Sequence, residues 1–149
     1  MSGLSDLYQE ILLEHNSKPR NFHIIDPYTH DKEGFNPLCG DRIHLYVDIQ
    51  NNVINDVGFQ GSGCAISRAS TSMLTETIKG KSMETIHQIF EEVHKMLTVP
   101  NADLDSEVLG DLEMLSGVTD FPVRIKCAML SWHTLKSVID NSDEPVSTE

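Results

Sequence analysis

The sequence predicts an α+β fold, with one small antiparallel sheet and a block of helices on one of its faces. Apolar and polar residues alternate over residues 42–49, which is the period of a half-buried strand. The pair Asn51-Asn52 suits the positive backbone angles of a tight hairpin turn, and residues 53–59 form the returning strand. Stretches with helical spacing follow this hairpin instead of alternating with strands. That order is typical of α+β folds.

Three more elements are expected around the hairpin. Apolar residues three and four positions apart predict a helix over residues 4–15. Residues 22–38 lack a regular period and should form a loop with one short strand. After the hairpin, helical spacing over residues 66–78 predicts another helix, and Gly80 suits the position just past its end.

Three helices are expected in the second half of the chain. Ser82 is placed to cap the first of them. The apolar stripe of this helix is the clearest in the chain and consists of Ile86, Ile89, Phe90, Val93 and Leu97. A short helix is expected over residues 106–115. Pro122 suits the first turn of the last helix, which should run to about Ile139.

The chain has 149 residues, 39% of them hydrophobic and 23% charged, which fits one globular domain. We expect that domain to cover residues 1–140 and an acidic, flexible tail to follow over residues 141–149. No apolar run approaches the ~20 residues of a membrane helix, and the first residues do not resemble a signal peptide. The expected compartment is therefore the cytoplasm.

The chain is strongly acidic, with 11 Lys+Arg against 23 Asp+Glu and a formal net charge of −12. Nucleic-acid binding relies on basic residues that displace counterions, and anionic membrane surfaces also attract basic segments. We therefore expect neither nucleic acid nor a membrane among the partners. The acidity is equally consistent with solubility alone and with a partner that has a basic docking face.

The three cysteines, Cys39, Cys64 and Cys127, raise the central question about function. An odd, sparse set is not a secreted disulfide framework, so the alternatives are buried thiols, a metal site or reactive thiols. The cysteines are far apart in the sequence and form no compact metal-binding motif. Their spacing alone leaves separate buried thiols and shared metal ligation both open.

The local context of these cysteines is compatible with a metal site. In an extended chain, Cys39 and Asp41 point to the same face and both can hold one ion. Cys64 is expected at the start of a helix, where unpaired N–H groups favour a thiolate, and Cys127 lies in the first turns of the last helix. Three thiolates and one carboxylate are four ligands, as tetrahedral zinc requires. Arg124 shares a helix face with Cys127, and both Arg124 and Lys126 are placed to offset the negative charge of these ligands.

Several stretches along the chain carry a specific pattern. The longer ones are residues 18–21, 36–41, 61–67 and 121–128, and shorter ones lie at 7–11, His15, 69–70, 72–73, Leu130 and Trp132. In these stretches the sequence resembles the U-type, or NifU/IscU-like, family of iron–sulfur cluster assembly proteins. The resemblance runs from about residue 4 to residue 139. Because these stretches occur in the order of the family, the resemblance is specific.

The resemblance implies a SufE/NifU-like fold, with a three-stranded antiparallel sheet backed by helices. It implies that Cys39, Asp41, Cys64 and Cys127 form a zinc site. It also implies a pyridoxal-phosphate-dependent, SufS-like cysteine desulfurase as partner, and further iron–sulfur cluster assembly proteins downstream.

Two features make the chain similar to the SufU branch of this family. Scaffold proteins of the IscU branch carry a histidine directly before the third cysteine, and Lys126 occupies that position here. Lysine is a poor zinc ligand at neutral pH because it must first lose its proton. The stretch over roughly residues 80–120 is also longer than in the IscU branch.

The likeness to the SufU branch implies a role for each site residue. A histidine of the desulfurase displaces Cys39 from zinc, and Cys39 then accepts persulfide sulfur, so that the protein is a sulfurtransferase-like partner of the desulfurase. Asp41, Cys64 and Cys127 keep the metal. We expect Arg124 to support the site, either by a salt bridge to Asp41 or by offsetting its negative charge.

Two other functions remain open on the same residues. Thiolates suit both zinc and iron–sulfur clusters, so the four ligands are also able to hold iron or a [2Fe–2S] cluster that the protein assembles and hands on. The third hypothesis is a zinc-stabilised adaptor that activates the desulfurase by docking, without carrying sulfur.

Overall fold

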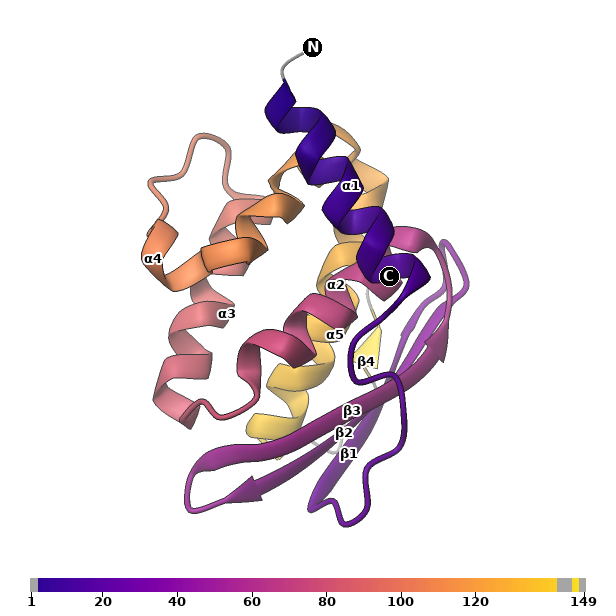
Figure 1. Ribbon diagram of the computed structural model, residues 1–149, viewed down its shortest axis with the longest axis vertical. Coiled ribbons are helices and arrows are strands. Elements are labelled where there is room, and N and C mark those ends of the chain that lie inside the picture. The colour runs from indigo at the N-terminus through magenta and orange to yellow at the C-terminus, as the bar shows by residue number, and fades with distance from the viewer. Residues whose placement is uncertain (1–2, 142–145, 148–149) are drawn as a thin grey trace.

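The computed structural model describes residues 3–141 and 146–147 (Figure 1). The elements are, in chain order, α1 (Gly3–Ser17), β1 (His30–Asn36), β2 (Asp41–Gln50), β3 (Val53–Ser62), α2 (Ala65–Ile78), α3 (Met83–Thr98), α4 (Ser106–Leu109), the 3-10 helix η1 (Gly110–Asp120), α5 (Pro122–Ile139) and β4 (Val146–Ser147). This order confirms the predicted α+β class. No helix in the described part of the chain has the length and apolar character needed to cross a membrane.

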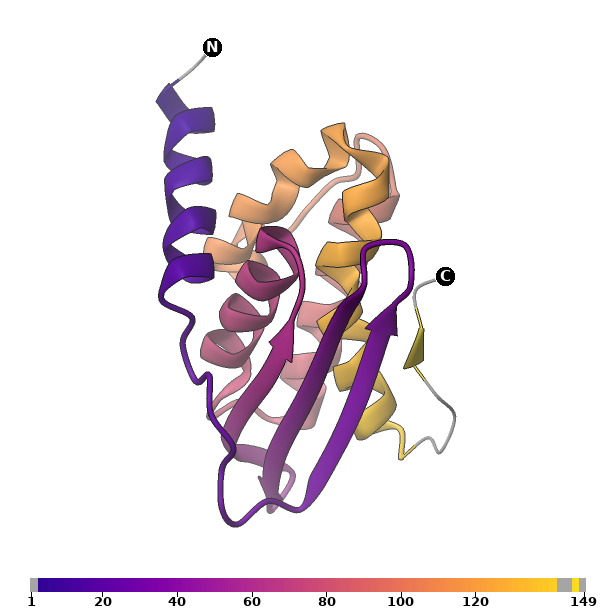
Figure 2. The same ribbon diagram turned by 90° about the vertical axis from the view of Figure 1, so that its right-hand side faces the viewer.

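The sheet has the strand order β3-β2-β1-β4 (Figure 2). Its three long strands are antiparallel, as predicted, while the two-residue strand β4 pairs in parallel with Gly34 and Phe35 of β1. Strand β4 falls within the tail expected over residues 141–149. Residues 142–145 and 148–149 lie outside the described residues, so the flexibility of that tail stays a prediction.

The predicted hairpin turn is confirmed between β2 and β3. Asn51 and Asn52 have φ angles of 52° and 66°, the left-handed conformation that a two-residue turn between twisted strands requires. The turn places Tyr46 opposite Gly58, and Leu45 opposite Phe59. This register assigns alternate residues of both strands to opposite faces of the sheet.

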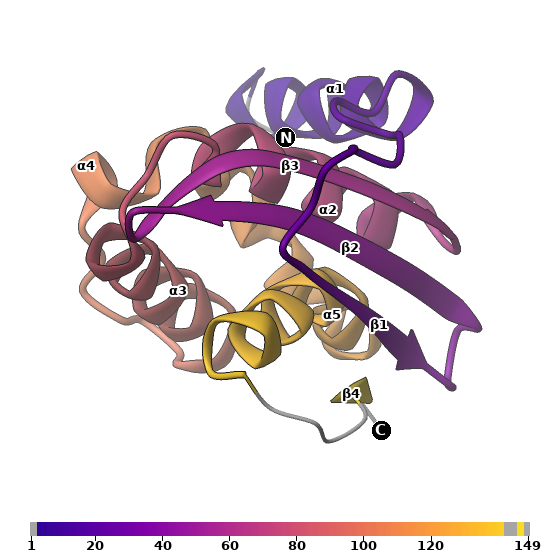
Figure 3. The ribbon, with the colours of Figure 1, turned by 90° about the horizontal axis from the view of Figure 1, so that it is seen from below.

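The hydrophobic core lies between one face of the sheet and the helices. Leu45, Val47 and Phe59 are fully buried on that face, and Trp132 of α5 belongs to the same cluster. Helices α2 and α5 pack against the strands and against each other, with α3 beside α5 and α1 against α2 (Figure 3). On the opposite face, Tyr28 packs edge-on against Tyr46 at 5.2 Å between ring centroids.

Most helix boundaries follow the local signals in the sequence. Ser82 caps α3 by accepting a hydrogen bond from the Thr85 N–H, and α5 begins at Pro122. The short helix expected over residues 106–115 is wrong in type, because only Ser106–Leu109 is α-helical and a 3-10 helix follows. Gly110 has φ 52° and ψ −132°, and this non-helical backbone interrupts the α-helix.

Candidate metal centre

A tight turn over residues 37–40 joins β1 to β2 and carries Cys39. Asn36 and Asp41 face each other across this turn as the last and first residues of the two strands. Cys39 and Asp41 are therefore brought together by a turn. The sequence-based reasoning that an extended chain places them on one face is wrong, although the proximity that it predicted is present.

Cys127 and Cys39 are 88 positions apart in the sequence and meet at this turn. Their Sγ atoms lie 3.3 Å apart. Ligand atoms of Cys39, Asp41 and Cys127 all lie within 4.8 Å of one another. The first turns of α5 stand beside the β1–β2 turn, and this packing brings Cys127 to Cys39 (Figure 2).

Cys64 lies at the edge of this group of three residues. Its Sγ is 3.9 Å from Asp41 Oδ2, and its backbone N–H donates to Asp41 Oδ1 at 2.8 Å. Cys64 is the N-cap of α2, where its sulfur accepts from the Ser67 N–H at 3.5 Å. This is the helix-start position predicted for it. We call Cys39, Asp41, Cys64 and Cys127 the cysteine–aspartate cluster.

Asp41 is fully buried, and both of its carboxylate oxygens accept hydrogen bonds. Oδ1 accepts from the backbone of Cys64, and Oδ2 accepts from Asn36 Nδ2 at 3.2 Å. Asn36 also donates to Cys127 Sγ at 3.4 Å. The prediction of site residues missed Asn36, although this residue begins the matching stretch 36–41. Its buried amide links two members of the cluster.

Gly63 allows Asp41 to approach the start of α2. A Cβ atom at Gly63 would collide with Asp41 Oδ1 and lie 2.9 Å from its Cγ.

We expect Gly63→Ala to displace the Asp41 side chain. Metal binding should then weaken by about 10–100-fold, as it does when other groups that orient a ligand are lost. Chelator competition measures this affinity. Gly80→Ala is the matched control, because Gly80 also has a positive φ, of 84°, but a Cβ there meets no described atom within 4 Å. Equal affinities of the two variants would contradict the prediction.

Burial disfavours charge on the Cys127 thiol. Its pKa is raised by burial first, and then by hydrogen bonding with Cys39, Asp41 and Cys64. Three thiols and a carboxylate in so small a space cannot all ionise without a compensating positive charge. A divalent cation supplies that charge and converts coordinating thiols into thiolates. The donor set of three sulfurs and one carboxylate oxygen fits zinc, and it also fits iron–sulfur chemistry.

Arg124 brings a positive charge to the exposed side of the cluster. Its guanidinium donates to Cys39 Sγ at 3.6 Å. Its pKa is raised by hydrogen bonding to Cys127 and by the charges of Cys64 and Cys39. Of the two partners expected for Arg124, its guanidinium lies beside sulfur, and among the described residues no ion pair joins it to Asp41. Its supporting role stays a prediction.

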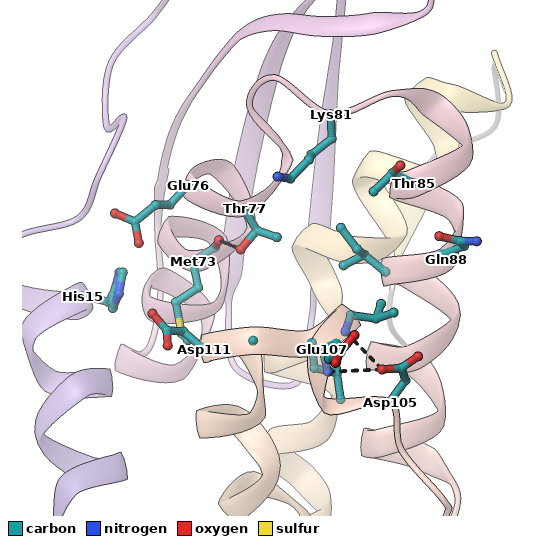
Figure 4. A pocket seen from close by; sticks show the side chains of 14 residues that line it. His15, Met73, Glu76, Thr77, Lys81, Thr85, Gln88, Asp105, Glu107 and Asp111 are labelled. Carbon is teal, nitrogen blue, oxygen red and sulfur yellow. Dashed lines mark hydrogen bonds between the residues drawn. The ribbon is translucent and has the colours of Figure 1, made fainter.

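A cavity lies apart from the cysteine–aspartate cluster. It has a volume of about 590 Å³ and lies between α2, α3 and residues 105–111 (Figure 4). Its charged lining residues are His15, Glu76, Lys81, Asp105, Glu107 and Asp111. His15 is held through Nδ1 by the Ser72 hydroxyl at 2.8 Å. No cysteine lines this cavity, so it is not part of the candidate metal centre.

Comparisons with known proteins find similar sequences over most of this chain. The family model "NifU-like N terminal domain" matches residues 7–128. The chain is 42% identical over 136 residues to "Zinc-dependent sulfurtransferase SufU" of Bacillus subtilis, covering 91% of this chain and 90% of that protein. It is 34% identical to "Iron-sulfur cluster assembly scaffold protein IscU" of Thermotoga maritima, covering 93% of this chain and 96% of that protein.

The fold is also found among solved structures. A crystal structure of FiSufU, a SUF-system protein from Fervidobacterium islandicum AW-1, superposes with a TM-score of 0.84 at 31% identity. The match covers 92% of this chain and 99% of the other. A NifU-like protein from Brucella abortus matches with a TM-score of 0.82 at 19% identity, which shows a shared fold. This chain belongs to the family of the NifU-like N-terminal domain, whose relatives include proteins named as a zinc-dependent sulfurtransferase and as iron–sulfur cluster assembly scaffolds.

Proposed function

We propose that this protein is a zinc-dependent sulfur acceptor in iron–sulfur cluster assembly, which takes sulfur from a SufS-like cysteine desulfurase through Cys39. The observation that carries the proposal is the convergence of three cysteines and Asp41 in one cluster, with Cys39 on its accessible side. The naming of the Bacillus subtilis relative as a zinc-dependent sulfurtransferase supports the same function.

In this proposal, Cys39, Asp41, Cys64 and Cys127 hold the zinc ion. The ion supplies the positive charge that keeps the thiols ionised at neutral pH, where a free thiol of pKa ~8.5 is only a few per cent ionised. Asp41 and Cys127 are fully buried and fixed by hydrogen bonds. These two residues are suited to staying in place during sulfur transfer.

Cys39 is the member of the cluster suited to leave it. Its residue is partly exposed and stands on a turn between two strands, whereas Cys127 is buried on α5 and Cys64 caps α2. Movement of a short turn disturbs less packing than movement of a helix start. The position of Cys39 therefore agrees with the role that the family resemblance implies for it.

The transfer of sulfur from the desulfurase to Cys39 needs no outside oxidant or reductant. The Cys39 thiolate attacks the terminal sulfur of the desulfurase persulfide, so that a new S–S bond forms on Cys39. The S–S bond of the desulfurase breaks, and its cysteine leaves with the electron pair as a thiolate. One persulfide is consumed and one is made, and a proton on the terminal sulfur travels with it.

A scaffold function is the second candidate. Relatives in Thermotoga maritima and Streptococcus pyogenes, 34% and 37% identical, are named as IscU scaffold proteins. The same four residues would then hold a [2Fe–2S] cluster. Lys126, in the position where IscU-type scaffolds have a histidine, favours sulfur transfer over this function. Activation of the desulfurase by docking alone is the third possibility.

One experiment separates these functions. Metal is measured in protein purified with and without air, and the protein is then incubated with a cysteine desulfurase and cysteine. We expect bound zinc and a persulfide that alkylation and mass mapping locate on Cys39. A brown protein with visible absorption and no zinc would instead support the scaffold. Faster desulfurase turnover without sulfur on any cysteine would support the adaptor.

The exposed Arg124 should assist transfer by stabilising negative charge on Cys39. We expect Arg124→Ala to slow persulfide formation on Cys39 by about two- to fivefold, the range of an exposed charge interaction. Lys126→Ala is the matched control, because Lys126 carries the same charge two residues further along α5, and among the described residues no hydrogen bond or ion pair joins its side chain to the cluster. Equal rates for wild type and Arg124→Ala, at equal zinc content, would remove Arg124 from the site.

A further inference from the structure

We infer that Asn36 is a positioning residue, which orients Asp41 and Cys127, but not the Cys39 sulfur, as ligands. The inference rests on the proposed function and names the residue that keeps the remaining ligands in place. Asn36 is the last residue of β1 and is fully buried. A buried amide at the end of a strand needs hydrogen-bond partners, and here its partners are members of the cluster.

One amide nitrogen serves two ligands. Asn36 Nδ2 lies 3.2 Å from Asp41 Oδ2 and 3.4 Å from Cys127 Sγ. Because an amide nitrogen carries two hydrogens, it can donate to both at the same time. Asn36 is paired with Asp41 across the β1–β2 ladder, which places both side chains on the same face of the sheet. Helix α5 packs against β1 and brings Cys127 to the same nitrogen.

The orientation of this amide is fixed by a third neighbour. The backbone N–H of Leu38 donates to Asn36 Oδ1 at 3.3 Å. A backbone N–H can only donate, so the amide oxygen must face Leu38 and the nitrogen must face the two ligands. The same bond ties the turn that carries Cys39 to the end of β1. Within the described residues, no hydrogen bond joins Asn36 to Cys39 itself.

Asn36 has a specific role because it bonds to two members of the cluster, Asp41 and Cys127. Two N–H bonds from one nitrogen fix the Asp41 oxygen and the Cys127 sulfur relative to each other and orient both as ligands. Loss of a residue that orients metal ligands in this way typically weakens metal binding by about 10–100-fold. Asn36 acts on Asp41 and Cys127 and leaves the Cys39 sulfur untouched. It therefore stabilises the ligands that remain when Cys39 takes up sulfur.

The test compares two variants with a matched control. Asn36→Ala removes the amide, and Asn36→Leu removes its donors while keeping a similar volume. Asn55→Ala is the control, since Asn55 Nδ2 also donates to a buried carboxylate, Asp48 Oδ2 at 3.0 Å, near the Asn51-Asn52 turn at the other end of β2 and β3. Each protein is loaded with zinc for chelator competition and alkylation mapping, and with cobalt(II) for absorption spectra.

We expect both Asn36 variants to bind zinc about 10–100-fold more weakly than wild type and Asn55→Ala. Their sulfur-to-cobalt absorption band should move to lower energy, because a thiolate that loses a hydrogen bond donates electrons more strongly. In the zinc-loaded variants, alkylation should spread from Cys39 to Cys127. A merely structural role for Asn36 would lower thermal stability without changing the cobalt band or the alkylation pattern.

Two results would overturn the inference. The first is wild-type zinc affinity, cobalt spectrum and alkylation in both Asn36 variants. The second is a change in Asn36→Ala that Asn36→Leu does not share, because lost volume would then be its cause. None of these measurements uses a desulfurase, so they can fail while Cys39 still accepts sulfur. A wild-type protein that binds neither zinc nor cobalt would overturn the proposed function together with this inference.

Discussion

Replacing Cys39 with alanine should abolish persulfide formation on this protein while zinc stays bound. Cys39 is the partly exposed thiol on the β1–β2 turn, and the other ligands, Asp41, Cys64 and Cys127, remain in the variant. Loss of a covalent nucleophile typically costs on the order of 10³- to 10⁶-fold in rate. Mass mapping after incubation with desulfurase and cysteine, together with zinc analysis, measures both properties.

Cys39→Asp is the matched variant for this prediction. A carboxylate at position 39 can replace the thiolate as a zinc ligand, but it cannot carry a persulfide. We expect Cys39→Asp to hold zinc more tightly than Cys39→Ala and to be equally inactive in sulfur transfer. Persulfide on Cys64 or Cys127, formed at the wild-type rate in either variant, would show that Cys39 is not the acceptor.

Replacing Cys127 with alanine should cause the largest loss of metal and of stability. Cys127 is fully buried, and its sulfur lies 3.3 Å from Cys39 Sγ. Structural zinc contributes about 10–16 kcal/mol in small peptides, whereas a whole domain has a net stability of about 5–15 kcal/mol. If the free energy of unfolding fell by only ~4 kcal/mol, the melting temperature would fall by roughly 8–16 °C, at about 2–4 °C per kcal/mol. Calorimetry and metal analysis, each with and without chelator, measure the effect.

Ser131→Ala is the control for this second prediction. Ser131 lies one turn further along α5 and is also buried, and its hydroxyl finds no hydrogen-bond partner in the part of the chain that the structure describes. Its removal should leave zinc content unchanged and the melting temperature equal or slightly higher, because an unsatisfied buried hydroxyl is costly. Chelator should lower the melting temperature of wild type and Ser131→Ala to a similar extent. Full zinc occupancy in Cys127→Ala would show that Cys127 is not a ligand.

Elements specified by neighbouring residues were predicted well. Asn51-Asn52 adopts the hairpin turn because asparagine tolerates positive φ angles, and Pro122 begins α5 because its ring fits the first helical turn. The segment after Ser106 was not predicted, because apolar spacing does not distinguish an α-helix from a 3-10 helix. Strand β4 was missed as well, since two residues have no period of their own and pair only with a distant strand.

The candidate site could likewise be predicted only in part from the sequence. The sequence indicated the thiolate and carboxylate ligands through its residue types and through the likeness of its motifs to a known family. It also indicated that Cys64 begins a helix and that Arg124 lies near Cys127. Whether Cys39 and Cys127 meet depended on the tertiary structure. These residues are 88 positions apart, and only the packing of α5 against β1 brings their sulfurs together. The role of Asn36 was hidden for the same reason, because one of its partners, Cys127, is 91 positions away.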